Sequence, residues 1–334
     1  MPAVFLPVMS VFVRHTHGWW NTQSPFKYPY AFASYPTHKR YRRLREEWGF
    51  DPDVLLFSDS GGYSLLTGAE NIDPYDLAEW YNTAGIDVGM SLDYPPYSDP
   101  SKRSVAEFDK RLEFTVRSSK ILLDNVKSSV KLYATIHGQS YKQYDVWRHG
   151  MLVLSDDWFG WAFAISPAED PNAVLRIIRY LESIKNDRPV HFFQAGSAVC
   201  FLLAARYANK RDLFVTADST HATSAARKGW DYLTIFSLRT VPVGRKIRGP
   251  EGAVERVDCP CPVCQRYGPN TVRDDYEVLD LHNTYLLTWR SRFLNAISTE
   301  KPELIKLVLP EAVPYIRQLD AILEKRGGGL LDYA

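Results

Sequence analysis

Eight short runs rich in β-branched and aromatic residues recur along this chain of 334 residues, and helical patterns separate nearly all of them. The runs cover roughly residues 3–11, 54–58, 86–92, 131–136, 158–165, 190–195, 213–217 and 231–236. Strands that alternate with helices predict a parallel sheet, and eight such units predict a (β/α)8 barrel. In that fold the chemistry lies at the carboxyl ends of the strands.

Helix signals fill most of the gaps between the runs. Asp73-Pro74 and Asp170-Pro171 each place an N-cap residue before a proline at the first helical position. Further helices are expected over 101–127, directly after Gly196, and over 222–229. Residues 12–36 are rich in aromatics and prolines, and we expect them to form an insertion after the first strand.

The alternation of strands and helices stops near residue 238, where Gly, Pro, Arg and Cys become frequent. We therefore expect three parts. Residues 1–237 form the barrel, 238–275 form a small zinc-binding insertion, and 276–334 form helices that complete the barrel and the zinc site.

The charge balance limits the classes of partner. The chain carries 40 basic and 39 acidic side chains, a net charge of +1, so nucleic-acid binding must come from local patches. No stretch reaches the roughly 18 apolar residues of a membrane span. A cytoplasmic protein without a membrane partner is expected, and a homodimer or partner proteins remain open.

The most specific local motif is a cluster of cysteines. Cys259, Cys261 and Cys264 lie within six residues, and His282 follows on a predicted helix. Three thiolates and one imidazole make a closed tetrahedral zinc site, which is structural because no position is left for a substrate. The alternative is three reduced cysteines in a tight loop beside an unrelated histidine.

Three aspartates follow predicted strands and are expected at one rim. Asp59 precedes Ser-Gly-Gly, Asp93 follows the third run, and Asp218 follows the seventh. Close like charges raise one another's pKa, which suits a nucleophile beside a proton-transfer group. Taken alone, Asp-Ser-Gly-Gly is equally typical of a capped turn. Other rim positions expected to bind substrate are Ser60, Gly61, Gly62, His137, Gly138, Gln139, Ser166 and Gly196.

In their order along the chain, these motifs resemble the tRNA-guanine transglycosylase superfamily. The resemblance rests on Asp-Ser-Gly-Gly-Tyr at 59–63, Leu92-Asp93, the His137-Gly138 turn, Asp218 followed by 225–229, and the cysteines with His282-Asn283. It implies a (β/α)8 barrel with a zinc subdomain. It also implies a pentosyltransferase that exchanges guanine for a 7-deazaguanine base in a nucleic acid.

The resemblance also implies roles for single residues. Asp218 matches the nucleophile that attacks C1′, Asp59 matches the proton-transfer residue, and Asp93 matches the carboxylate that accepts hydrogen bonds from the base. The same arrangement follows from chemistry, since glycosyl exchange needs a carboxylate on the sugar face and an acid near the leaving base.

Several departures from the family pattern bear on the polymer. Members that act on tRNA carry Pro-Thr-Arg shortly after the nucleophile, whereas this chain reads Ala222-Thr223-Ser224. The family's Gln-Gly-Gly is replaced by His137-Gly138-Gln139. These differences look like the DNA-modifying, DpdA-type branch, so DNA is expected in preference to tRNA.

Two basic groups are candidate nucleic-acid contacts. The segment 38–45 interleaves Lys and Arg with Tyr41, although a solvated face paired with Glu46 and Glu47 explains it equally well. The second group adjoins the nucleophile and the zinc segment and comprises Arg227, Lys228, Arg239, Arg245, Lys246 and Arg248.

Alternatives from other classes stay open. They are the same chemistry on tRNA, a non-catalytic subunit whose barrel is a partner surface, and a sugar hydrolase. Retention of both Asp59 and Asp218 argues against a non-catalytic subunit. A sugar hydrolase does not predict the zinc motif.

Overall fold

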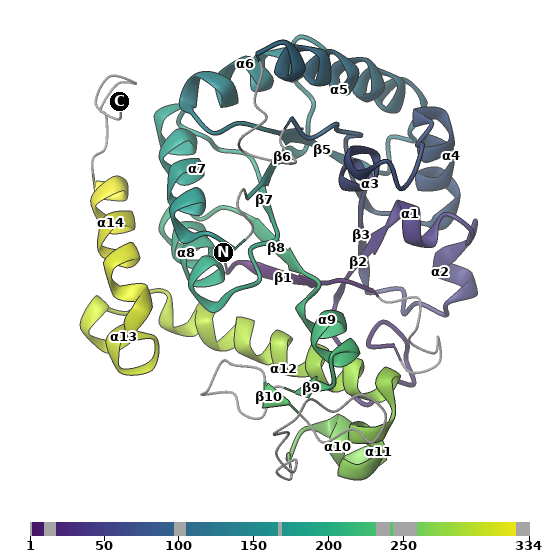
Figure 1. Ribbon diagram of the computed structural model, residues 1–334, viewed down its shortest axis with the longest axis vertical. Helices are drawn as coiled ribbons and strands as arrows, with labels where there is room; N and C mark the ends of the chain where they lie inside the picture. Colours follow the sequence, from purple (N-terminus) through teal and green to yellow (C-terminus); the bar gives the residue numbers. More distant parts are fainter. Residues whose placement is uncertain are drawn as a thin grey trace.

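Eight parallel strands form a ring surrounded by helices, as the computed structural model shows (Figure 1). The structure describes residues 2–9, 18–96, 105–165, 169–231, 241–242 and 259–324. The strand order is β1-β8-β7-β6-β5-β4-β3-β2. A parallel bridge between Val8 and Phe32 joins the two end strands, and Met9 N–H donates to Phe32 O at 2.8 Å. The predicted (β/α)8 barrel is therefore confirmed.

The barrel strands are short, as expected for this fold. They are β1 (Val4–Pro7), β2 (Tyr30–Ser34), β3 (Leu55–Asp59), β4 (Val88–Met90), β5 (Lys131–Ile136), β6 (Gly160–Ala164), β7 (Val190–Phe193) and β8 (Val215–Ser219). Seven of the eight runs in the sequence predicted one of these strands.

The eighth predicted strand, over 231–236, is wrong as a barrel strand. Instead, β9 (Trp230–Asp231) pairs antiparallel with β10 (Val241–Pro242) in a separate small sheet, and 232–236 lie outside the described residues. The remaining barrel strand is β2, within the segment expected to be an insertion. Its sequence Tyr-Ala-Phe-Ala-Ser alternates two strand-forming aromatics with alanine, which is depleted in strands, and contains no β-branched residue, so the propensity signal was weak. As a result, Asp59 ends the third strand and Asp218 belongs to the eighth.

The helices lie around the strands. They are α1 (Tyr35–His38), α2 (Leu44–Glu47), α3 (Gly62–Thr67), α4 (Pro74–Ala84), α5 (Val105–Asn125), α6 (Tyr141–Leu152), α7 (Pro171–Ser183), α8 (Ala198–Arg211), α9 (His221–Arg227), α10 (Pro262–Tyr267), α11 (Pro269–Asp274), α12 (Tyr276–Ile297), α13 (Pro302–Val308) and α14 (Val313–Glu324). None of the helices in the described ranges is both long and apolar enough to cross a membrane.

The predicted start signals are the observed ones. The side chains of Asp73 and Asp170 accept the backbone N–H groups of Tyr75 and Asn172, and a proline follows each cap. The cap carboxylates satisfy amides that the first turn of a helix leaves unpaired.

Side-chain alternation along the strands produces two apolar layers. Leu6, Phe32, Met90 and Tyr133 pack together within the ring, whereas Phe5 belongs to the larger cluster that includes the helix residues. Because successive side chains of a strand point to opposite faces, each strand contributes to both layers. Polar groups therefore meet mainly at the ends of the strands.

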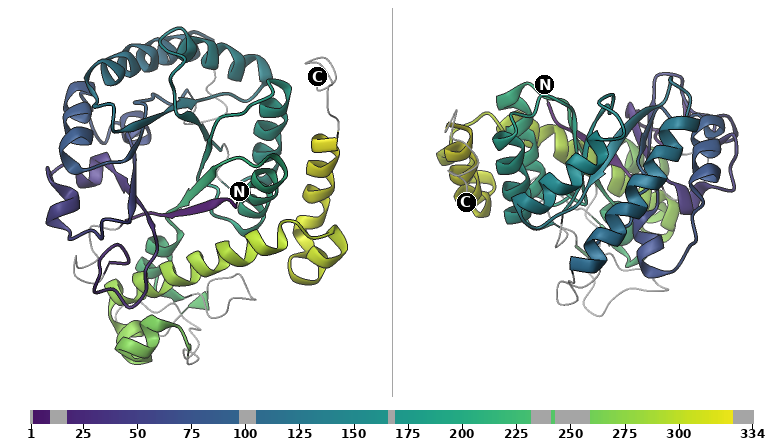
Figure 2. Two further views of the ribbon diagram at one scale, coloured as in Figure 1. Left: turned by 180° about the vertical axis from the view of Figure 1, so that it is seen from behind. Right: turned by 90° about the horizontal axis from the view of Figure 1, so that it is seen from above.

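Helix α12 packs against the barrel through two asparagine side chains. Asn295 exchanges hydrogen bonds with the backbone of Ala3 beside β1, and Asn283 donates to Ala222 O in α9 at 3.4 Å. Helix α14 lies outside α7 and α8 (Figure 2), and Arg206 of α8 forms a bidentate pair with Asp320. The two asparagine contacts hold α12 against the start of β1 and against α9, the helix that follows the last barrel strand.

Candidate active site and metal centre

Asp59 ends β3 in an environment that favours its neutral form. Burial raises the pKa of Asp59 from 3.8 to about 7, and the negative charges of Asp218 and Asp93 raise it further. Hydrogen bonds from the Ser34 side chain and the Tyr35 backbone act in the opposite direction. Its Oδ1 atom is buried with no hydrogen-bond partner among the described residues. A carboxyl group of this kind can hold or release a proton near neutral pH.

Asp93 follows β4, and both of its oxygens are held. His137 Nε2 lies 2.7 Å from Oδ2, and the Ser60 hydroxyl donates to Oδ1 at 3.2 Å. His137 itself packs edge-on against Trp147. A carboxylate can accept more than one bond at each oxygen, so Asp93 retains the capacity to accept donors from a ligand.

The two glycines after Asp59 are required by this arrangement. Gly61 has φ of +87°, in the left-handed region that favours glycine. A Cβ atom on Gly62 would lie 2.6 Å from both carboxylate oxygens of Asp93. The Asp-Ser-Gly-Gly segment therefore brings the end of β3 against the end of β4, which goes beyond a capped turn.

Asp218 lies within β8, and its Oδ1 atom meets two nitrogen atoms from β7 and the turn that follows. The backbone N–H of Gln194 donates to Oδ1 at 2.9 Å, and His191 Nε2 lies 3.4 Å from the same oxygen. Gln194 adopts φ of +59°, which is uncommon for a residue other than glycine. The turn thus holds a costly backbone conformation at the point where it contacts Asp218.

Most of the other predicted rim positions line the same strand ends. His137, Gly138 and Gln139 form the turn between β5 and α6, where Gly138 lies against Tyr144. Gly196 packs so closely on Ser219 that a Cβ atom would lie 2.1 Å from the serine Cβ. Ser166 lies outside the described residues. The structure therefore places elements from β3, β4, β5, β7 and β8 around one rim.

Four residues that contribute to this rim were missed from the sequence. They are Ser34 beside Asp59, His191 and Gln194 beside Asp218, and Arg290 of α12, which donates to Gly196 O. A histidine inside the apolar run Val-His-Phe-Phe was the one available signal, because alternation places it on a single face of β7.

The basic residues differ in their surroundings. Arg227 and Lys228 are exposed at the end of α9, whereas Arg239, Arg245, Lys246 and Arg248 lie outside the described residues. The segment 38–45 is not one helix, since a turn separates α1 from α2. Its ion pairs are Lys39–Glu70, Arg42–Glu79, Arg43–Glu46 and Arg45–Asp87. Of the two partners expected for a solvated face, Glu46 pairs with Arg43, whereas Arg45 is held within the fold by Gly85 O and Val54 O as well as by Asp87.

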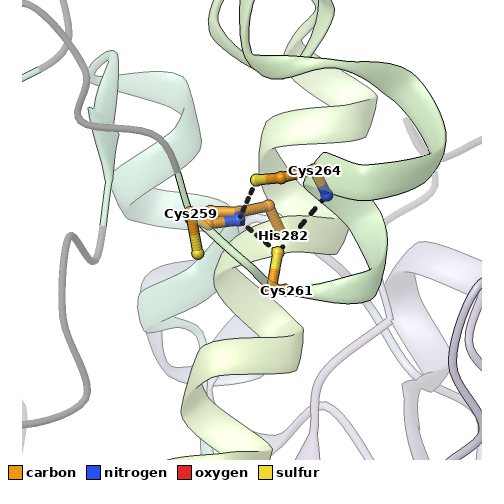
Figure 3. Close-up of side chains that lie close together, drawn as sticks. All are labelled: Cys259, Cys261, Cys264 and His282. Carbon is orange, nitrogen blue, oxygen red and sulfur yellow. Dashed lines mark hydrogen bonds between the residues drawn. The ribbon is translucent and has the colours of Figure 1, made fainter.

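The predicted metal ligands come together after the barrel (Figure 3). The donor atoms of Cys259, Cys261, Cys264 and His282 all lie within 4.8 Å of one another. The Sγ atoms of Cys261 and Cys264 are 3.2 Å and 3.3 Å from Nδ1 of His282. Bond lengths of about 2.3 Å to sulfur and 2.0 Å to nitrogen give roughly 3.5 Å between such atoms around a tetrahedral zinc ion. These four side chains can hold a metal ion.

The sequence is similar to those of archaeal tRNA-guanine(15) transglycosylases. No family model matches the chain. A tRNA-guanine(15) transglycosylase of Pyrococcus abyssi is 29% identical over 252 residues, covering 70% of this chain and 38% of the relative. The Pyrococcus furiosus enzyme of the same name is 30% identical over 253 residues, covering 71% and 39%. The chain is a distant homologue of these archaeal enzymes.

More divergent archaeal relatives carry the same name. The Methanocaldococcus jannaschii protein is 23% identical over 282 residues, which cover 77% of this chain and 39% of the relative. The chain thus spans about two fifths of the length of the curated relatives it matches. The homology supports the tRNA-guanine transglycosylase superfamily and does not distinguish a DNA-modifying branch within it.

Proposed function

We propose that this protein is a base-exchange transglycosylase that replaces guanine in a nucleic acid with a 7-deazaguanine. The observation that carries the proposal is the convergence of Asp59, Asp93 and Asp218 at the carboxyl ends of barrel strands. Homology to tRNA-guanine(15) transglycosylases supports the same reaction class. A non-catalytic barrel has no need for a carboxyl group with a pKa raised to about 7 beside two others.

Asp218 is the proposed nucleophile. Its carboxylate attacks C1′ of the target nucleotide and forms a C1′–O bond, while the bond from C1′ to the guanine nitrogen breaks and its electron pair goes to the base. Asp59 supplies the proton that the departing guanine needs, which its raised pKa permits at neutral pH.

The second half of the reaction reverses these roles. Asp59, now ionised, removes the proton from the attacking nitrogen of the incoming 7-deazaguanine. The electron pair of that nitrogen forms the new bond to C1′, and the bond to Asp218 breaks and releases its carboxylate. Protons and electrons balance over the cycle, and no external oxidant or reductant is needed.

Asp93 is the proposed base-recognition residue. Its oxygens can accept the N1–H and the exocyclic amine of guanine or its deaza analogue, a donor edge that adenine lacks. His137 and Ser60 hold the carboxylate in place from the protein side. Ser60, Gly61, Gly62, Gly138, Gln139, Ser166 and Gly196 are the other proposed substrate contacts.

The nucleic acid that carries the target guanine is either tRNA or DNA. The relatives are tRNA-guanine(15) transglycosylases, which favours tRNA, in contrast to the expectation from the sequence. DNA is a second candidate because α9 carries Ala222-Thr223-Ser224, small side chains where tRNA-specific members of the family place an arginine. For either polymer the target base must leave the stack, at a cost of a few kcal/mol. The proposed phosphate contacts are Arg227, Lys228, Arg239, Arg245, Lys246 and Arg248.

The metal of the cysteine cluster is proposed to be structural zinc. Three thiolates and an imidazole suit zinc, and this closed set leaves no ligand position for a substrate. We also propose that 1–237, 238–275 and 276–334 act as barrel, zinc module and completing helices, respectively.

The test is incorporation of labelled base into polymer. Purified protein is incubated with labelled guanine or 7-deazaguanine and with either tRNA or DNA, and label is followed into the polymer. An Asp218→Asn variant should lose at least roughly 10³-fold in rate, because an amide is a poor nucleophile. Asp124→Asn on the outer helix α5 is the matched control and should retain activity, since Asp124 is exposed and pairs with Lys120.

Three outcomes decide the proposal. Label in tRNA supports the function suggested by the relatives. Label in DNA alone changes the polymer and keeps the chemistry. Absence of label from both polymers, with no covalent adduct on a denaturing gel, refutes the transglycosylase.

A further inference from the structure

His191 is a polar side chain placed inside the apolar ring of the barrel. It lies on β7, opposite Thr216 in the strand register, and is fully buried. Its ring stacks on Phe32 with centroids 5.5 Å apart and meets Phe193 edge-on at 4.5 Å. These aromatic contacts fix the plane of the imidazole.

The two ring nitrogens of His191 face different partners. Nδ1 lies 2.8 Å from the Thr216 hydroxyl, and Nε2 lies 3.4 Å from Oδ1 of Asp218. Thr216 and Asp218 are two residues apart on β8, so their side chains share a face of the strand. If the threonine hydroxyl donates to Nδ1, the proton of the neutral imidazole lies on Nε2 and faces the carboxylate.

The 3.4 Å separation is longer than a normal hydrogen bond. Nε2 has no hydrogen-bond partner within the described ranges, and an unpaired buried polar atom is costly. Hydrogen bonds in active sites are often long before the substrate binds and shorten in the complex. Asp218 is the polar group in position to complete this bond.

The donors around Asp218 converge on a single oxygen. The Gln194 N–H donates to Oδ1 at 2.9 Å, and His191 Nε2 approaches the same atom. Gln194 has a positive φ at the same position where its N–H meets that oxygen. The hydrogen bond from Gln194 and the nearby His191 ring both lie on the Oδ1 side of the carboxylate, so Oδ2 is the oxygen left for another partner.

We propose that His191 is a positioning residue that acts through Asp218, an inference that rests on the proposed transglycosylase function. Its Nε2–H holds Oδ1, so that Oδ2 is the oxygen that attacks C1′. Together with Gln194, it stabilises the ionised carboxylate and aligns it before the substrate arrives. Preorganised donors of this kind favour reaction because no reorientation is needed in the transition state.

A purely structural histidine makes a different prediction about substitutions. The side-chain amide of glutamine reaches about as far as Nε2, whereas that of asparagine reaches only as far as Nδ1. His191→Gln therefore retains a donor toward Asp218, and His191→Asn retains only a partner for Thr216. Both variants place an amide in the same apolar surroundings, so they form a matched pair.

The kinetic test measures covalent adduct formation at saturating nucleic acid. We expect His191→Asn to slow the adduct step at least roughly tenfold and His191→Gln to stay within a few-fold of wild type, with KM unchanged in both. Equal rates for the two variants beside an active wild-type protein overturn the inference and leave the proposed function intact. A wild-type protein that forms no adduct refutes the proposed function, and the inference falls with it.

A spectroscopic measurement on the wild-type protein covers the case in which a variant fails to fold. Long-range ¹⁵N–¹H spectra of the histidine rings report which nitrogen carries the proton. We expect His191 to be protonated on Nε2, and Asp218→Asn to shift that resonance. A proton on Nδ1, or a resonance that does not respond to Asp218→Asn, overturns the inference whatever the enzyme does.

Discussion

The acidic rim and the cysteine cluster are both groups of potential ligands, but their side chains are satisfied in opposite ways. In the cluster, the donor atoms of Cys259, Cys261, Cys264 and His282 face one another. At the rim, Asp218 is held at one oxygen and Asp59 has a buried oxygen with no partner among the described residues.

This difference separates a structural site from a reactive one. In a closed ligand set every donor atom binds the metal and so stabilises the fold. A carboxyl group whose oxygens are only partly hydrogen-bonded can still bind a substrate. At the rim, three features lower the stability of the folded state: unpaired buried atoms, close like charges and the left-handed backbone of Gln194. If the comparison holds, substitutions at the rim change the reaction and substitutions in the cluster change the stability.

Among the changes that test this comparison, the largest effect is expected from removing the proton-transfer group, Asp59. Asp59→Asn should slow adduct formation by roughly 10²–10⁴-fold. In the wild-type protein, adduct formation should slow as pH rises through about 7, because protonated Asp59 gives the proton to the leaving base. The measurement is the single-turnover rate from pH 5.5 to 8.5. If the rate of the Asp59→Asn variant still falls as pH rises through about 7, as in the wild-type protein, another group transfers the proton.

The second prediction concerns the cysteine cluster. Cys261→Ala should remove the metal and lower the free energy of unfolding by roughly 2 kcal/mol or more, because metal binding is coupled to folding. Metal content by mass spectrometry and melting temperature are measured together. Cys200→Ala is the control, since Cys200 is buried in α8 away from the cluster and should leave the metal content unchanged. A stable, metal-free Cys261 variant with full activity would remove the structural assignment.

The two regions also differ in how far the sequence predicts them. Three cluster ligands lie within six residues, so their spacing alone indicates the site. The rim is assembled from strands that are far apart in the chain. Asp59, Asp93 and Asp218 were predicted because each follows an apolar run, and the fold class then places such ends together.

Other rim features depend on contacts that no local pattern contains. Ser34 lies on β2, whose alanine-rich sequence hid the strand, and Arg290 reaches Gly196 from a helix 94 residues later in the chain. The left-handed backbone of Gln194 has no local signal, since glutamine does not favour that conformation. The strand expected over 231–236 was wrong for the same reason, because its apolar pattern carried no information about which sheet it joins.

A third prediction tests how much the buried Asp59 carboxyl group lowers the stability of the protein. The pKa of Asp59 is raised from 3.8 to about 7 in the folded protein, so the folded state binds the proton more tightly. Stability should therefore fall as pH rises between these values, at most by about 1.4 kcal/mol per pH unit. Asp59→Asn should gain stability relative to wild type between pH 5 and pH 8, as measured by urea unfolding. A constant difference across this range would mean that Asp59 is ionised throughout.

The smallest predicted effect isolates the strain next to Asp218. Gln194→Gly should raise the free energy of unfolding by about 1 kcal/mol relative to Gln194→Ala, because glycine adopts φ of +59° without steric cost and alanine does not. Both variants lack the side chain beyond Cβ and retain the backbone N–H, and they differ by the Cβ atom alone, so their difference in stability reports the cost of a Cβ atom at this backbone conformation. Urea unfolding of the pair gives that difference. Equal stabilities would mean that the turn relaxes out of the left-handed region, and that the rim carries less of the fold's strain than its geometry implies.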